Sequence, residues 1–158
     1  MPAVHSATTQ LLTFELSRQR YGIPLRDVSE VVRAVSLAPL PKAPPIVEGV
    51  INLPGTIVPV LDIRARFKLP SKAIAPADHL VIARAKHRLV AVRVERALGL
   101  VRLTTREVDD LASLAPTSEY VAGAAKLPDG IGLIHDLATF LSAAEDEALS
   151  DAEKRLPP

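Results

Sequence analysis

The chain has 158 residues, of which 48% are hydrophobic and 23% are charged, and this composition predicts a globular protein of one compact unit or two small subdomains. Its 19 basic and 18 acidic residues nearly cancel and are interspersed, which argues against a nucleic-acid binder, because such proteins need a basic face. The absence of cysteine excludes disulfides and thiolate metal sites. With no signal peptide and no apolar run of about 18 residues, the sequence predicts a cytoplasmic protein without membrane insertion.

Alternating apolar and polar residues predict a β-hairpin near the N-terminus. In the segment 11–16 every second residue is apolar, which is typical of a half-buried strand. A polar turn at 17–20 leads into a return strand at 21–25, and Pro24 is expected near the end of that strand, because proline donates no hydrogen bond to a sheet. Residues 1–10 are expected to be a flexible terminus.

A short helix is predicted directly after this hairpin. Asp27 and Glu30 have the spacing of a capping box, and Val28, Val31 and Val32 have the spacing of one helical face. Taken alone, such an apolar stripe is more often buried core than a partner surface.

The remaining elements follow from alternation, turn residues and capping patterns. In order they are strands flanking Pro54–Gly55 within 49–63, a helix at 64–68, a hairpin of 80–83 with 89–94, a strand at 98–103, a helix at 104–111, a hairpin of 123–127 with 131–134, and a helical segment from 136 to about 148. Proline followed by glycine favours a type II turn at Pro54–Gly55. The segment 39–45 contains four prolines; it could be a polyproline ligand, but an ordinary rigid loop is the better interpretation.

The two halves of the chain resemble each other. At an offset of 74 residues, the segments 49–62 and 123–136 share five identities, and at an offset of 68 the two upstream hairpins also correspond. The repeat predicts two similar small β-barrels, with approximate halves 11–68 and 78–137. Each is too small to bury a good core alone, so we expect them to be joined across a shared apolar surface.

The stretch Gly49-Val-Ile-Asn-Leu-Pro-Gly-Thr-Ile-Val-Pro-Val-Leu-Asp-Ile63 resembles the signature of the CheW family of coupling proteins. Three other segments fit the same family in order and spacing. They are Phe14-x₆-Tyr21-Gly22-Ile23 with the following Val28-x-Glu30-Val31-Val32, Pro44-Pro45-x₂-Glu48-Gly49, and Glu119-Tyr120-Val121-x-Gly123 with Lys126-Leu127. The resemblance spans residues 11–141 as a single domain, followed by a charged, partly helical tail at 142–158. A chain of this length holds one such domain and has no room for a kinase or receiver domain.

The resemblance implies a mostly β fold of two five-stranded SH3-like β-barrels around a common hydrophobic core, with short helices and a C-terminal helix. It also implies a non-enzymatic scaffold without cofactors that links receptors of the methyl-accepting chemotaxis type to a CheA-type histidine kinase. The groove between the barrels is expected to receive the receptor tip, and one barrel is expected to dock onto the regulatory domain of the kinase. The protein would then be recruited to membrane-associated receptor arrays.

Carried over residue by residue, the resemblance places the receptor contacts in the first half of the chain. The receptor-binding residues it implies are Val28, Glu30, Val31, Gly49, Asn52, Pro54 and Gly55. It places part of the kinase-binding surface on Gly123 and Leu127. One position departs from the family: Pro54 stands where an arginine is common, which fixes the backbone φ but removes a cationic donor.

Other functional classes lack support in the sequence. No nucleophile elbow, phosphate loop or dinucleotide fingerprint is present, and the histidines at positions 5, 79, 87 and 135 lack a metal-ligand spacing. Asp62 and Asp136 occupy equivalent strand ends, which favours caps over a catalytic carboxylate pair. The alternative to a coupling protein is a stand-alone SH3-like module that binds peptide or nucleic acid outside chemotaxis. The basic or aromatic stripe expected of a nucleic-acid binder of that kind is missing.

Overall fold

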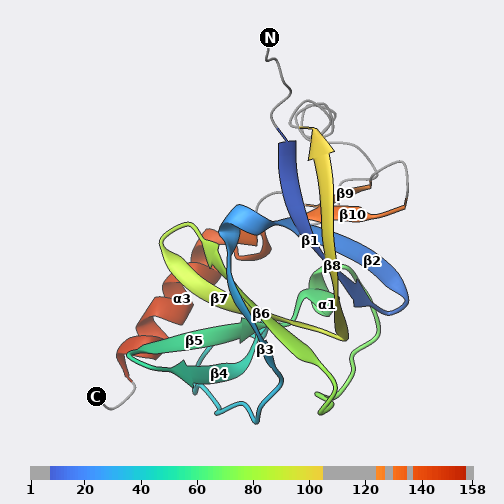
Figure 1. The fold of residues 1–158 in the computed structure, drawn as a ribbon. Helices are drawn as coiled ribbons and strands as arrows, with labels where there is room; N and C mark the ends of the chain where they lie inside the picture. The colour runs from blue at the N-terminus through green and yellow to red at the C-terminus, as the bar shows by residue number, and fades with distance from the viewer. Residues whose placement is uncertain (1–7, 105–123, 127–129, 135–136, 156–158) are drawn as a thin grey trace.

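The computed structural model describes residues 8–104, 124–126, 130–134 and 137–155. Over these residues the fold is mostly β, with short helices and one longer helix near the C-terminus (Figure 1). The strands are β1 (Thr8–Leu16), β2 (Gln19–Pro24), β3 (Val28–Arg33), β4 (Val47–Leu53), β5 (Thr56–Leu61), β6 (His79–Ala85), β7 (Arg88–Val94), β8 (Arg96–Thr104), β9 (Ala124–Lys126) and β10 (Gly132–Ile134). The helices are η1 (Leu25–Asp27), α1 (Ile63–Arg66), η2 (Leu137–Phe140) and α3 (Ala143–Lys154). The predicted mostly β fold class is confirmed.

The strands form two five-stranded sheets, one for each SH3-like barrel. Sheet A has the order β8-β1-β2-β10-β9, and sheet B has the order β3-β6-β7-β5-β4. Each sheet takes strands from both parts of the chain, so the barrels do not follow the approximate halves 11–68 and 78–137. The reason is a reciprocal exchange: β5 pairs in parallel with β7, and β10 pairs in parallel with β2. Parallel pairing needs a long connection, and here the intervening strands supply it.

The two upstream hairpins correspond, but at an offset of 69 residues rather than 68. The hairpin turns fix this number, because Leu16 pairs with Gln19 and Ala85 pairs with Arg88, and 85 − 16 = 88 − 19 = 69. With an offset of 68, inward and outward side chains would be exchanged, since strand residues alternate between faces. At the offset of 69, Phe14 corresponds to Ala83, and both side chains are buried in the same core.

The predicted helix around Val28–Val32 is wrong, and the capping box at Asp27 and Glu30 does not form. The segment Val28–Arg33 is the edge strand β3, and a single 3₁₀ turn at Leu25–Asp27 precedes it. A β-bulge at Ser29 explains the misleading pattern, because the register against β6 shifts between Val28 and Glu30. The extra residue puts side chains three apart on one face of a strand, which imitates helical spacing.

The two sheets pack over one shared hydrophobic core. Its buried side chains come from sheet A, including Leu12, Phe14 and Ile23, and from sheet B, including Val81 and Val92. Smaller clusters fill each barrel separately: a cluster that includes Leu80 and Ile82 lies in sheet B, and a cluster that includes Leu11 lies in sheet A. The shared core makes the two barrels one rigid body, as expected of units too small to be stable alone.

The C-terminal helix lies later in the chain than the sequence indicated. α3 runs from Ala143 to Lys154, whereas helical character was expected from Asp136 to about Ala148. Ser142 begins it with a complete capping box to Glu145, which fixes the start. Its buried face consists of Leu149 and Ala152, which pack with Leu40 and Val50.

An arginine of the β7 strand fastens α3 to sheet B. The Arg88 side chain pairs with Asp146 at 2.7 Å and with Glu153 at 2.8 Å, and it also donates to the hydroxyl of Ser150. A further ion pair joins Arg66 to Glu145. The helix is therefore an integral part of the packed structure. The predicted helix at 104–111 lies outside the described residues apart from Thr104, which ends β8.

Candidate interaction surface

The edge strand β3 carries two valines on the face that borders the shared core. Val28 lies opposite Ala83 and Val31 lies opposite Val81, and both partners belong to the shared core. The bulge at Ser29 is what puts the two valines on one face. Val28 is half-buried against that core, whereas the Val31 side chain is 37% exposed.

The edge strand β8 repeats this arrangement in sheet A. Ala97 lies opposite Phe14 and Leu100 lies opposite Leu12, with an extra residue, Leu98, at the register shift. The hydroxyl of Thr13 donates to the carbonyl oxygen of Gly99 at 2.9 Å and so supports the irregular strand. Leu98 and Leu100 are 40% and 54% exposed.

These residues define an edge-strand rim that consists of Val28, Val31, Leu98 and Leu100. It borders the shared core on both sheets with large apolar side chains that remain accessible. Exposed apolar groups grouped along the border of a core are typical of surfaces that another protein covers. Glu30 lies beside the rim on β3 and is also exposed, but it lies opposite Ile82, so its side chain leaves the strand on the other face.

The remaining receptor-binding residues predicted from the sequence lie on the other edge of sheet B. β4 carries Gly49 and Asn52, and the turn to β5 contains Pro54 and Gly55. In the hydrogen-bonding order of sheet B, β3 and β4 are opposite edges. A bridge between Ala38 and Val50 ties the chain that follows β3 to β4. The structure thus divides the predicted residues into a β3 group and a β4 group.

Within the β4 group, Gly49 and Gly55 have different structural roles. A Cβ atom on Gly49 would lie 2.7 Å from the carbonyl oxygen of Ala38, so only glycine permits the close approach of this segment. Gly49 is buried, and it therefore supports the surface rather than forming part of it. Gly55 has a φ of 78°, the value that the third position of a type II turn requires, and its surroundings are open. Asn52 and Pro54 are exposed.

A buried arginine of β7, Arg93, forms an ionic cluster at one end of sheet B. The Arg93 side chain pairs with Glu48 at 2.7 Å and with Asp78 at 3.2 Å, and it donates to the carbonyl oxygen of Lys72. The side chains of Arg93 and Asp78 are 4% and 3% exposed, so the buried Asp78 carboxylate depends on Arg93 for compensation.

A second ionic cluster lies next to it, around Glu95. Arg64 donates to Glu95 at 2.8 Å, the backbone N–H of Ser17 donates to the same oxygen, and Lys72 is 3.6 Å from the other oxygen. The hydrogen bond from Arg64, followed by that from Ser17, lowers the pKa of the Glu95 carboxyl to about 2. Asp62 caps the helix that carries Arg64, as predicted, by accepting from the backbone N–H of that residue. Each charged side chain of the cluster has an ionic partner within the chain, which favours a structural role.

Several predicted functional residues lie outside the described part of the chain. They include the kinase-binding residues Gly123 and Leu127, and Asp136, the expected counterpart of Asp62. Among the described residues, no group of histidine and acidic side chains could hold a metal ion. No helix within the described ranges is long and apolar enough to cross a membrane.

Sequence reasoning missed the β8 half of the rim. The signal was available in the repeat, since adding 69 to Val28 and Val31 gives Ala97 and Leu100. At the offset of 68, Val31 aligns with Gly99 instead, so the correspondence between the two apolar positions was hidden.

Comparisons with known proteins agree with this architecture. A family model described as the CheW-like domain matches residues 10–145. The protein named chemotaxis protein CheW of Treponema pallidum is 25% identical over 155 residues, which cover 94% of this chain and 91% of the relative. That of Thermotoga maritima is 32% identical over 100 residues, covering 63% of this chain and 66% of the relative.

A solved structure has the same fold over nearly its whole length. It is described as the scaffolding protein TtCheW from Thermoanaerobacter tengcongensis, and it is 25% identical with a TM-score of 0.72, covering 92% of this chain and 95% of that one. Two SH3-like barrels around one core define the class of the protein as a two-barrel adaptor. The chain belongs to the CheW-like domain family.

Proposed function

We propose that this protein is a non-enzymatic coupling scaffold that links the signalling tips of chemoreceptors to the regulatory domain of a CheA-type histidine kinase. The observation that carries the proposal is the edge-strand rim, where Val31, Leu98 and Leu100 stay exposed at the border of the shared core. Membership of the CheW-like family and the scaffolding neighbour support the same function.

The receptor tip binds along the rim, with the β4 group as a second contact. An α-helical tip can place apolar side chains three and four residues apart against a strip of this kind. Leu98 and Leu100 extend the receptor surface from β3, which the sequence indicated, to β8. Gly123 and Leu127 remain the proposed contacts for the kinase.

The scaffold acts through geometry rather than chemistry. One rigid body with two contacts raises the effective concentration of kinase near receptor, even when each contact is weak. The shared core provides the rigidity, because strands from both parts of the chain build each sheet. The protein is recruited in this way from the cytoplasm to membrane-associated receptor arrays.

Reconstitution tests the proposal. The purified chain is mixed with a receptor signalling-tip fragment and a CheA regulatory domain from its own organism, and complexes are measured by analytical ultracentrifugation. We expect both binary complexes and a ternary complex. Binding to neither partner refutes the proposal, and would favour the alternative of a barrel module that acts outside chemotaxis.

A further inference from the structure

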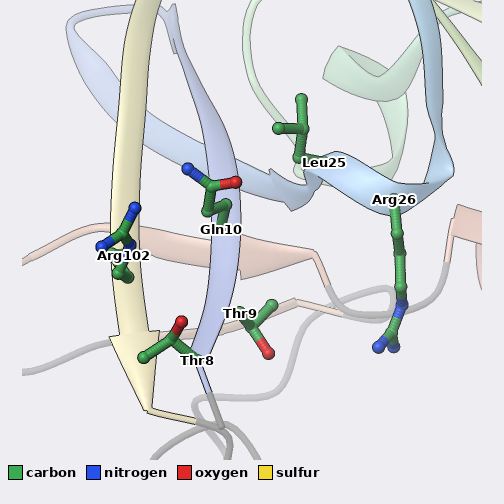
Figure 2. A pocket seen from close by; sticks show the side chains of 6 residues that line it. All are labelled: Thr8, Thr9, Gln10, Leu25, Arg26 and Arg102. Carbon is green, nitrogen blue, oxygen red and sulfur yellow. The ribbon is translucent and has the colours of Figure 1, made fainter.

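A basic hollow lies in sheet A between β1, β8 and η1. Its volume is about 380 Å³, and the residues that line it are Thr8, Thr9, Gln10, Leu25, Arg26 and Arg102. Figure 2 shows Arg102 on β8 and Arg26 on η1, on opposite sides of the three β1 residues. Figure 1 places this region toward the N-terminal end of β1.

The hollow continues the edge-strand rim. Arg102 lies opposite Gln10, just as Leu100 lies opposite Leu12, so both of these β8 side chains leave the strand on the same face. On the other side, η1 runs directly into β3, where the rim resumes at Val28. A partner that lies along the rim therefore reaches the hollow without changing direction.

The charge of the hollow is uncompensated among the described residues. Among the described residues, the charged ones that line it are Arg26 and Arg102, and neither has an ion-pair partner in this part of the chain. Both side chains are exposed. An exposed guanidinium group is well suited to a carboxylate, which it binds with paired, charge-assisted hydrogen bonds.

The corresponding end of sheet B contains acids as well as a base, since Arg33 corresponds to Arg102. At the offset of 69, Thr9 corresponds to Asp78 and Arg26 corresponds to Glu95. Both acids are paired within the chain: Asp78 with Arg93, and Glu95 with Arg64 and Lys72. The acids at this end of sheet B are thus paired within the chain, whereas the two arginines of the basic hollow have no ion-pair partner among the described residues.

We propose that the basic hollow binds an acidic side chain of the receptor tip, at the end of the apolar strip that the rim contacts. This inference rests on the proposed receptor function and specifies the chemistry of the partner. It predicts a helical tip with an apolar stripe that ends in an aspartate or glutamate. The carboxylate fixes the register of the tip along the rim, because charged pairs set orientation as well as association rate.

The test compares a double variant with a matched control. Arg26→Gln combined with Arg102→Gln removes both charges of the hollow. The control is Arg84→Gln, an exposed arginine of β6 without an ion pair in the described ranges, whose side chain lies outside the hollow and off the rim. Binding of the wild-type chain, the double variant and the control variant to the receptor-tip fragment is measured by calorimetry at low and at high salt.

We expect the double variant to bind about tenfold more weakly at low salt, with the difference nearly lost at high salt. The control is expected to keep the wild-type affinity, and all three proteins should have equal melting temperatures because the altered residues are exposed. If the wild-type chain binds the tip and the double variant binds it equally well, the inference is wrong and the proposed function stands. If the wild-type chain does not bind the tip, both are wrong.

Two further arms identify the ligand. Tip carboxylates are changed one at a time to amides; one of these changes should weaken binding to the wild-type chain and have no further effect in the double variant, as a double-mutant cycle requires of a direct pair. Inorganic phosphate is then titrated against the free chain while amide spectra are recorded. Phosphate that binds through Arg26 and Arg102, with no carboxylate coupled to them in the tip, would show a site for a free anion and overturn the proposal.

Discussion

The two edge strands β3 and β8 have the same backbone and different chemistry. Each contains a bulge at the equivalent position, Ser29 in one and Leu98 in the other, and the pairing registers agree residue by residue at the offset of 69. The core-facing positions on either side of the bulge are apolar in both strands: Val28 and Val31 in β3, and Ala97 and Leu100 in β8. The outward position after the bulge is Glu30 in β3 and Gly99 in β8. Burial therefore determines the shape of the strand, whereas its exposed positions remain free to differ.

The ends of the two sheets differ more than the strands themselves. In sheet B, the buried pair of Arg93 and Asp78 joins the sheet to the preceding loop. In sheet A, the equivalent place is the basic hollow, whose arginines have no ion-pair partner in the described part of the chain. The same backbone thus supports a structural ionic cluster in one barrel and an open, charged surface in the other. Substitutions in the first should affect stability, and substitutions in the second should affect binding.

The largest effect is expected from Arg93→Ala. This change leaves the Asp78 carboxylate buried without its cation, and breaking a buried pair in this way costs about 3–5 kcal/mol. Urea denaturation should therefore show a large loss of unfolding free energy. Arg26→Ala, on the exposed side of the comparison, should change it by less than about 0.5 kcal/mol. Similar losses in the two variants would contradict the distinction between the two ends.

The pH dependence of stability should depend on Glu95. Its pKa is lowered from 4.5 to about 2 in the folded state, chiefly by the hydrogen bond from Arg64. A lowered folded-state pKa stabilises the protein above the unfolded-state pKa, and this stabilisation is lost as the pH falls from about 5 toward 2. Glu95→Gln should remove on the order of 1.5–3 kcal/mol at neutral pH, the usual contribution of hydrogen bonds to a charged group.

The measurement is a series of urea melts of the wild-type chain and Glu95→Gln between neutral and acidic pH. The unfolding free energy of the variant should fall less steeply with acid, so that the two curves converge near the folded-state pKa. Parallel curves would show that other carboxylates account for the acid sensitivity.

Much of the fold was predictable because burial leaves a strong pattern in this chain. The alternation in 11–16 and the Pro54–Gly55 turn correspond to β1 and to the hairpin of β4 with β5. Asp62 was predicted as a cap and is one. The exchange of strands between barrels was not predictable from local patterns, because the parallel pairs of β5 with β7 and of β10 with β2 join segments far apart in the chain.

Of the edge-strand rim, only the β3 half was predictable from the sequence, and the reason is physical. The resemblance indicated Val28 and Val31, but the bulge at Ser29 gave them helical spacing, so the segment was wrongly predicted to be a helix. Leu98 and Leu100 lie in a strand that carries apolar residues on both faces, so alternation alone does not reveal them. The basic hollow brings together Arg26 and Arg102 from distant segments, and net charge gives no indication of such a cluster.

The equivalence of the two rim strands can be tested with Val31→Asp and Leu100→Asp. Both side chains are substantially exposed, so each variant should keep its melting temperature while binding the receptor tip at least about tenfold more weakly, because a charge on an apolar contact must be desolvated. Val35→Asp, which alters an exposed valine beyond the end of β3, is the matched control. A collapsed melting temperature for Val31→Asp would mean that Val31 acts as core. Loss of binding in one variant alone would confine the receptor to one barrel.

The smallest effect is expected at Pro54, in the turn between β4 and β5 that belongs to the β4 group. Gly55 has the backbone conformation of a type II turn, so Pro54 occupies the position where its fixed φ is favourable. Pro54→Arg should therefore lower the unfolding free energy by only about 0.4–1 kcal/mol, the reverse of the gain from a compatible proline. The same change adds a guanidinium to an exposed turn, and if the receptor tip presents a carboxylate there, affinity should rise and become more sensitive to salt. Calorimetry with the tip fragment at low and high salt measures this difference. Unchanged affinity at both salt concentrations would show that position 54 does not face the receptor, and that this turn is wrongly placed in the receptor contact.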